Sequence, residues 1–238
     1  MVSSEPSRTA PPPVDNRAPQ QIVIAGFPTG TSPIYHYTVK SLDSSESGVI
    51  DAPDKIAEIT LSPQHYTRPP YTEVVIYLLT KDRSWLKLED QPAGRSGFPQ
   101  KWMSFDPKKL PNEDGTPDVY SGETAPRAAY IIFENSSDIS RTSSGHFRGT
   151  VNLSQTEGFL TAKNLKALGK KADSIPFTVV LDAQGRLTST TMRIPAAAKF
   201  KGGTFEITYD HYGTAAVPKL PTAAEQTKAP ATLYRLFN

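Results

Sequence analysis

The sequence predicts an α+β fold that is mainly antiparallel β-sheet, and residues 176–213 carry the strongest signal. Residues 177–182 and 204–210 alternate apolar with more polar side chains, a period of two that places one set on each face of a sheet. Residues 182–185 form a short polar connection whose glycine can take the positive φ that tight hairpins require. We therefore expect an antiparallel meander with one apolar and one more polar face.

Composition narrows the class of protein. The chain has 238 residues, of which 37% are hydrophobic and 21% charged, which is typical of a folded domain with a polar tail. A net charge of +2 and the absence of long basic runs give no indication of nucleic-acid binding. The chain has no cysteine, which excludes disulfides, thiol nucleophiles and thiolate metal sites.

The N-terminal third is expected to contain a tether and three strands. Residues 1–21 are rich in proline and polar side chains and predict a disordered tether, followed by a single domain over residues 22–238. Strands are expected at 21–26, 34–42 and 55–61, with a polar loop at 43–48. Residues 1–5 lack a basic n-region and an apolar h-region, so we expect any export signal to have been removed before Met1.

The middle of the chain predicts more strands. Residues 73–80 are apolar on both faces, which is typical of a central strand or of one lining an apolar interior. Residues 85–89 alternate apolar and charged side chains, and 102–105 form an aromatic patch. Further along, strands are expected near 139–142 and at 146–153. A turn or helix start at Asp106 and a loop at 110–117 complete this region.

Two helices are predicted in the second half. Residues 125–134 begin with Ala-Pro-Arg-Ala, which favours a helix although Tyr-Ile-Ile-Phe favours a strand. Residues 155–171 place an apolar stripe against a basic, solvent-facing side that includes Lys166, Lys170 and Lys171. A Pro/Ala/Thr-rich tail covers 217–238, and its last apolar residues are expected to dock on the domain.

Catalytic motifs are absent from the sequence. It contains no phosphate-binding glycine loop and no nucleophile elbow. The four histidines are scattered, and His211 follows Asp210 on an expected strand, where neighbours point to opposite faces. We therefore interpret the histidines as surface or hydrogen-bonding residues, and carboxylates such as Glu89 and Asp90 as solvent-facing. Nothing here indicates an enzyme, a cofactor or a metal.

Apolar and aromatic side chains remain as the candidate site. Each of them could serve only as core, but a sheet with few helices does not easily fill its covered face, and a pocket is a common result. On the strand at 73–80, Val74, Ile76 and Leu78 share one face and Tyr77 lies on the other. The candidate ligand-binding residues are the apolar side chains that we expect to point inward, together with Tyr77: Val74, Ile76, Tyr77, Leu78, Phe159, Leu165, Leu168, Phe177, Val179, Leu181, Phe205, Ile207 and Tyr209.

Several motifs occur in a characteristic order. Trp-Leu-Lys-Leu-Glu at 85–89 and His-Phe-Arg-Gly-Thr-Val-Asn-Leu at 146–153 precede the second helix. Ile-Pro-Phe-Thr-Val-Val-Leu-Asp-Ala-Gln-Gly-Arg-Leu at 175–187 and Gly-Thr-Phe-Glu-Ile-Thr-Tyr-Asp-His-Tyr-Gly at 203–213 follow it. Together they resemble the actinobacterial LppX/LprG-type lipoproteins and, more distantly, the LolA-like half-barrels. The resemblance is good over about residues 120–221 and weak over 25–115. Residues 94–122 could not be matched to the family.

The resemblance implies a single strongly curved sheet, a half-barrel, with helices over its concave face and an apolar cavity between them. It further implies an exported, monomeric, non-catalytic carrier that holds a lipid or glycolipid in the cell envelope. The family's lipid-modified cysteine has no counterpart here, so a lipid anchor to the membrane surface would have to lie outside this chain. Two alternatives remain open: an envelope interaction module with a filled cavity, or a sensor that holds a small apolar metabolite.

Overall fold

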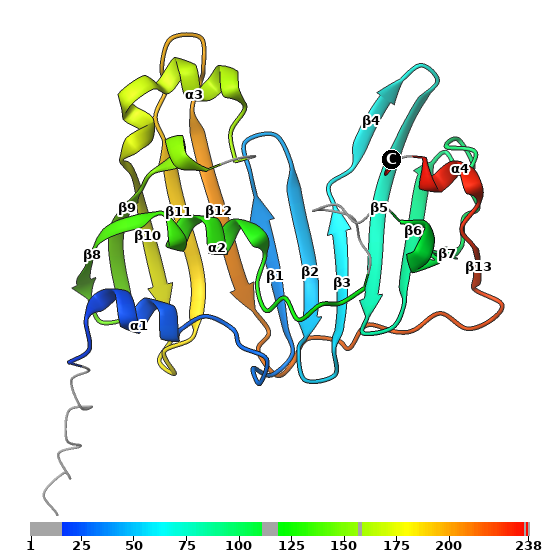
Figure 1. Cartoon of the computed structure of the whole chain (residues 1–238), viewed down its shortest axis with the longest axis horizontal. Helices are drawn as coiled ribbons and strands as arrows, with labels where there is room; N and C mark the ends of the chain where they lie inside the picture. The colour runs from blue at the N-terminus through cyan, green and yellow to red at the C-terminus, as the bar shows by residue number, and fades with distance from the viewer. Residues whose placement is uncertain (1–15, 111–118, 157–158, 236, 238) are drawn as a thin grey trace, which may run out of the picture.

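The computed structural model describes residues 16–110, 119–156, 159–235 and 237, and these form one open sheet of thirteen strands (Figure 1). The strand order is β13-β7-β6-β5-β3-β2-β1-β12-β11-β10-β9-β8, with β4 beside β5. Every pair is antiparallel except β13 with β7. The strands are β1 (Tyr35–Lys40), β2 (Ser45–Asp51), β3 (Ile56–Leu61), β4 (Gln64–Thr67), β5 (Pro70–Thr80), β6 (Ser84–Gln91), β7 (Trp102–Ser104), β8 (Ser136–Ser143), β9 (His146–Val151), β10 (Ile175–Leu181), β11 (Leu187–Ile194), β12 (Gly203–Asp210) and β13 (Gln226–Lys228).

Helical segments are short. They are α1 (Pro19–Ala25), η1 (Pro107–Lys109), α2 (Arg127–Glu134), η2 (Leu153–Gln155), α3 (Ala162–Leu168), η3 (Gly169–Asp173) and α4 (Ala231–Tyr234). Within the described residues, none of these helices is long and apolar enough to span a membrane. The fold class predicted from the sequence, α+β and mainly antiparallel β, is confirmed.

The predicted meander is present as β10, β11 and β12. In the β10–β11 hairpin, Asp182 Oδ1 accepts hydrogen bonds from the backbone N–H groups of Gln184 and Arg186, both at 2.9 Å, and Gly185 has a φ of 78°. The expected strands at 34–42, 55–61, 73–80, 85–89 and 146–153 correspond to β1, β3, β5, β6 and β9. The helix at 125–134 is also confirmed, as α2.

Two local predictions in the N-terminal third were wrong. Residues 21–26 are not a strand: α1 begins at Pro19, a residue already shaped for the first helical turn, and its Ile22 and Val23 are buried against the sheet. The tether expected over 1–21 therefore lies mostly outside the described residues, and its last three residues belong to α1. The loop expected at 43–48 overlaps β2, because pairing with β1 and β3 imposes a strand on polar residues.

The helix predicted over 155–171 is much shorter. Thr161 caps α3 by accepting a hydrogen bond from the backbone N–H of Asn164, and Gly169 ends the helix with a φ of 52°. Phe159 therefore precedes the helix, while Leu165 and Leu168 remain on it. Lys166, Lys170 and Lys171 are exposed, as predicted. The loop expected at 110–117 lies outside the described residues beyond Leu110.

The helices divide the sheet into two covered regions. In Figure 1, α1 and α2 lie in front of the β8–β12 half, and α4 lies at the β13 edge. We call the face that carries them the inner face. The larger of two hydrophobic clusters, here called the main cluster, lies on this face. In it, Ile22 and Val23 of α1 and Ala129, Ile132 and Phe133 of α2 pack against the buried side chains of the sheet. A separate edge cluster lies over β6, β7 and α4 and contains Leu86, Leu88, Met103, Phe105, Leu233 and Tyr234, so the predicted docking of the C-terminal residues is confirmed.

One cross-strand row joins both regions. Tyr37 of β1 pairs with Tyr209 of β12 on one side and with Gly48 of β2 on the other. Gly48 then pairs with Ile59 of β3, and Ile59 pairs with Tyr77 of β5. Tyr77 pairs with Leu86, which pairs with Met103 in the edge cluster. Because directly paired residues share a face, this row runs along the inner face from the main cluster to the edge cluster.

Gly48 is required in this row by the ring beside it. A Cβ on Gly48 would lie 2.6 Å from a ring carbon of Tyr37 and 2.7 Å from the carbonyl oxygen of Glu58. The Tyr37 ring is 1% exposed, and its hydroxyl donates to Glu46 Oε1 at 2.6 Å. Because the ring is buried and its hydroxyl is held by Glu46, it cannot move aside.

Gly48→Ala is expected to lower the free energy of unfolding by about 1–3 kcal/mol, the usual cost of overpacking a filled site. Urea unfolding followed by circular dichroism measures this change. Gly30→Ala is the control, because a Cβ at Gly30 meets nothing within 4 Å. An alanine at position 48 that was tolerated as well as one at position 30 would contradict the packing described for Tyr37.

Candidate functional site

The predicted site residues on the meander all lie on the inner face, and they are buried. Phe177, Val179 and Leu181 of β10 and Phe205, Ile207 and Tyr209 of β12 belong to the main cluster, each exposed by 7% or less. Phe133 of α2 packs edge-on against Phe177 with ring centroids 5.7 Å apart. These side chains fill the space below α2 and form a packed core.

The residues predicted on the second helix lie at one end of the main cluster. Leu168 is buried, whereas Phe159 and Leu165 are half-buried against the cluster. Phe159 and Phe205 have ring centroids 4.8 Å apart and line a pocket of about 90 Å³. That volume holds only a few non-hydrogen atoms, so this pocket alone is too small for an acyl chain.

The sequence pattern predicts Val74, Ile76 and Leu78 of β5 on the inward-facing side and Tyr77 on the other, and the structure shows the reverse. Tyr77 packs against both clusters, and its neighbours on the same face, Val75 and Leu79, each pack against one of them. Val74, Ile76 and Leu78 lie on the outer face. There Leu78 pairs with Trp85, whose Nε1 donates to Gln226 Oε1 at 2.9 Å. When a strand is apolar on both sides, the sequence pattern does not show which residues face inward, and this explains the error.

Between the two clusters the inner face carries apolar side chains that are only partly covered. Ile59, Val75 and Tyr77 are half-buried, in contrast to the fully buried residues on either side. Burial raises the pKa of Tyr77 to about 12, so this phenol stays neutral at physiological pH. We call these three residues the apolar seam.

A polar cluster lies next to the seam on the same face. Glu73 of β5 pairs directly with Asp90 of β6, and the two carboxylates are only 8% and 5% exposed. Asp90 Oδ2 accepts hydrogen bonds from the backbone N–H and the hydroxyl of Ser96, both at 2.8 Å, and from Gln100 Nε2 at 3.2 Å. Within the described part of the chain, Asp90 Oδ1 is buried with no hydrogen-bond partner. The prediction that Asp90 faces solvent was wrong.

Two tyrosines border this carboxylate pair. The rings of Tyr66 and Tyr71 stack with centroids 4.3 Å apart and an interplanar angle of 7°, and Tyr66 is 43% exposed. The Tyr66 hydroxyl donates to Glu73 Oε1 at 3.3 Å. Next to the apolar seam, the inner face therefore carries two stacked tyrosine rings and a pair of carboxylates.

The pKa of Glu73 is raised above its ordinary value. Desolvation is the largest cause, and the negative charge of Asp90 adds to it. The two side chains are close enough that a proton held by Glu73 would be hydrogen-bonded to Asp90. When both groups are ionised, this pair is therefore an unfavourable contact that a bound hydrogen-bond donor would relieve.

A histidine–aspartate group on the outer face was missed from the sequence. His36 Nδ1 and His211 Nδ1 lie 2.7 Å and 2.8 Å from Asp210 Oδ1. The expectation that Asp210 and His211 point to opposite faces was wrong because β12 ends at Asp210 and His211 has a φ of 53°. The direct pairing of His36 with Asp210 then brings in the third residue.

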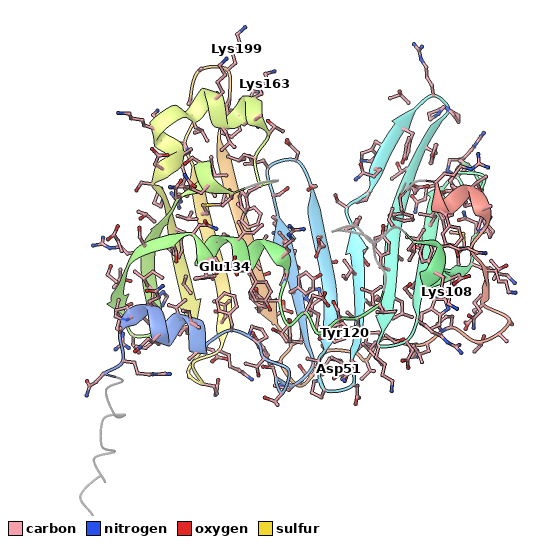
Figure 2. All side chains as sticks on the ribbon, in the orientation of Figure 1. Asp51, Lys108, Tyr120, Glu134, Lys163 and Lys199 are labelled. Atoms are coloured by element: carbon pink, nitrogen blue, oxygen red, sulfur yellow. The ribbon has the colours of Figure 1, made fainter. Side chains whose placement is uncertain are left out.

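Two further grooves are lined almost entirely by residues outside the predicted set. One of about 440 Å³ crosses β8–β11 and is lined mainly by outer-face residues such as Arg148 and Arg193; Phe177, whose ring packs on the inner face, also borders it. Another, of about 390 Å³, lies beside α3 and includes Lys163 and Lys199, which project from the same end of the molecule (Figure 2). Apart from Phe177, none of the candidate ligand-binding residues lines these two grooves.

Comparisons with known proteins add little. No protein family and no curated protein matches the sequence. A solved structure described as a porin-like protein from Bacteroides uniformis is similar over 78% of this chain and 98% of that chain, with 9% identity and a TM-score of 0.21. Similarity at that level supports no conclusion about fold or function.

Glu73→Gln is expected to stabilise the protein at pH 7.5, because it removes a buried charge beside Asp90 and keeps an acceptor for Tyr66. Glu73 has a raised pKa in the folded state, so its stabilising contribution is present below the unfolded value of 4.5 and is lost as the pH rises through the folded value. The advantage of the variant should therefore shrink at pH 4. Urea unfolding at both pH values measures it.

Glu134→Gln is the control for this experiment, since Glu134 is exposed at the end of α2 (Figure 2). We expect little change in stability from this variant at either pH. A Glu73→Gln protein that was less stable than the wild type at pH 7.5 would contradict the description of the carboxylate pair.

Proposed function

We propose that this protein is a non-catalytic carrier whose amphipathic ligand, a lipid or glycolipid, binds on the inner face of the sheet with its acyl chain along the apolar seam. The observation that carries the proposal is the half-buried state of Ile59, Val75 and Tyr77 between two fully buried clusters. Covering such side chains with an acyl chain is favourable by about 25 cal/mol per Å² of apolar surface removed from water.

The polar cluster supports a ligand with a hydroxyl-bearing head. Glu73 and Asp90 lie next to the seam at 8% and 5% exposure, and a sugar or polyol hydroxyl is the kind of donor that Asp90 Oδ1, buried without a hydrogen-bond partner in the described part of the chain, lacks. The stacked rings of Tyr66 and Tyr71 offer an apolar face against which a sugar ring can pack. Tail and head would then occupy adjacent parts of the same strand pair, β5–β6.

The remaining parts of this proposal follow the resemblance to the LppX/LprG-type lipoproteins. The open sheet would act as a half-barrel with its helices over the concave side. The protein would work as a monomer in the cell envelope, exported and held at the outer face of the membrane by an anchor outside this chain. Nucleic acid would not be a partner, in line with the net charge of +2.

A second candidate function is supported by the packed main cluster. Because the inner faces of β10 and β12 are filled by their own side chains and by α2, the same fold could serve as an envelope interaction or sensor module with a small cavity. This alternative predicts that no acyl ligand binds at the seam.

The two functions can be separated by a pair of variants on neighbouring residues. Val75→Phe places a bulkier side chain in the seam and is expected to weaken binding of a dansyl-labelled undecanoic acid at least tenfold. Val74→Phe is the matched control, because Val74 is also half-buried but lies on the outer face of the same strand. Fluorescence titration measures the affinities, and circular dichroism checks that both variants are folded.

The wild-type chain purified from its natural source is expected to carry an acyl ligand that native mass spectrometry detects. Equal binding of the fluorescent acid by the Val75→Phe and Val74→Phe proteins would remove the seam from consideration. Failure of the wild type to bind the acid, together with a ligand-free native mass, would favour the interaction or sensor module.

A further inference from the structure

The outer face carries three side chains whose nitrogen and oxygen atoms lie close together. His36, Asp210 and His211 each offer a metal-ligating atom, and these atoms lie within 4.8 Å of one another. Both imidazole Nδ1 atoms face the same carboxylate oxygen, Asp210 Oδ1, at 2.7 Å and 2.8 Å. From this geometry we propose that the three residues form a binding site for a divalent transition-metal ion, with Zn²⁺ as the reference case.

The local backbone explains how the three residues meet. His36 on β1 and Asp210 on β12 are direct cross-strand partners and point to the outer face. His211 follows the end of β12 in the left-handed region, with a φ of 53°, a conformation in which histidine is more frequent than most residues. Its ring therefore turns back to the Asp210 side, and the ring centroids of His36 and His211 are 6.1 Å apart.

The spacing of the donors suits a metal ion after small side-chain rotations. Ligands about 2.0–2.1 Å from a tetrahedral zinc ion are roughly 3.3 Å from one another, slightly farther apart than the nitrogen–oxygen distances found here. The ion would replace the two Nδ1–H···Oδ1 hydrogen bonds, and each neutral imidazole would then carry its proton on Nε2. Each side chain can make this adjustment because all three are partly or largely solvent-exposed, at 33%, 51% and 65% for His36, Asp210 and His211.

The donor set defines the class of ion. Two imidazole nitrogens and one carboxylate oxygen suit Zn²⁺, Co²⁺, Ni²⁺ and Cu²⁺, whereas Ca²⁺ and Mg²⁺ prefer oxygen ligands throughout. The exposure of the group leaves the remaining coordination positions to water.

A bound ion would also tie together distant parts of the chain. His36 and Asp210 are 174 residues apart in sequence, and the β1–β12 pairing is the junction between the N-terminal strands and the meander. An ion that binds only the folded protein raises its thermal stability by mass action. This site is independent of the proposed lipid carrier, since it lies on the opposite face of the sheet.

Isothermal titration of the untagged chain with Zn²⁺, together with Co²⁺ absorption spectroscopy, tests the site. We expect one ion per chain, visible d–d bands of a four- or five-coordinate Co²⁺ complex, and a higher thermal midpoint with Zn²⁺. His36→Ala and His211→Gly should each weaken binding at least tenfold. The glycine variant removes the ligand while easing the left-handed backbone, so it keeps the turn folded.

His65→Ala and His146→Ala are the matched controls, because both histidines are exposed and neither belongs to the group. They should leave the Zn²⁺ affinity unchanged. The proposal is overturned if the wild-type chain shows no stoichiometric Zn²⁺ binding, or if His36→Ala and His211→Gly bind it as tightly as the wild type does.

Discussion

The cross-strand row from Tyr209 to Met103 is the constraint on which the rest of the structure depends. It passes through Tyr37, Gly48 and Tyr77, and it fixes which side chain of each strand faces the helices. A shift of one residue at any pairing would exchange the two faces of the strand. The Tyr37 ring lying against the bare backbone of Gly48 opposes such a shift, since any other residue there would collide with it.

The same register produces the candidate ligand site. With Tyr77 inside, Val75 and Glu73 are also inside, and β6 supplies Leu88 and Asp90 opposite them. An apolar stretch and a buried carboxylate pair thus become neighbours on one face. Two carboxylates held at 8% and 5% exposure repel each other when both are ionised, and a strongly perturbed buried pair of this kind is more frequent at functional sites than elsewhere. The register therefore sets the Glu73–Asp90 pair beside the half-buried apolar seam, and on this neighbourhood we base the proposal of an amphipathic ligand.

Much of the fold could be predicted from local pattern, and the rest required long-range pairing. Phe205, Ile207 and Tyr209 alternate strictly with polar residues, so their burial follows from sequence. The apolar residues from Val74 to Leu79 have no such alternation, and only pairing with β6 decides their faces. Ile22 and Val23 favour a strand by propensity, but Pro19 and docking onto the sheet make them helical.

The sites were harder to predict than the fold for the same reason. Glu73 and Asp90 lie on the two strands of one hairpin, and only the exact β5–β6 register brings them face to face. Asp210 and His211 are adjacent, yet the rule that strand neighbours diverge fails where the strand ends and the backbone enters the left-handed region. An Asp-His pair at the end of a predicted strand, followed by Tyr-Gly, was the available signal for a turn.

We propose that an acyl chain binds on the inner face at the apolar seam. The most direct measurement is NMR detection of intermolecular NOEs between a ¹³C-labelled fatty acid and the side chains of the protein. We predict NOEs from the acyl methylenes to Ile59, Val75 and Tyr77, and none to Val74 or Ile76 on the outer face. Contacts confined to the outer face, or a saturating ligand that shows none at the seam, would contradict it.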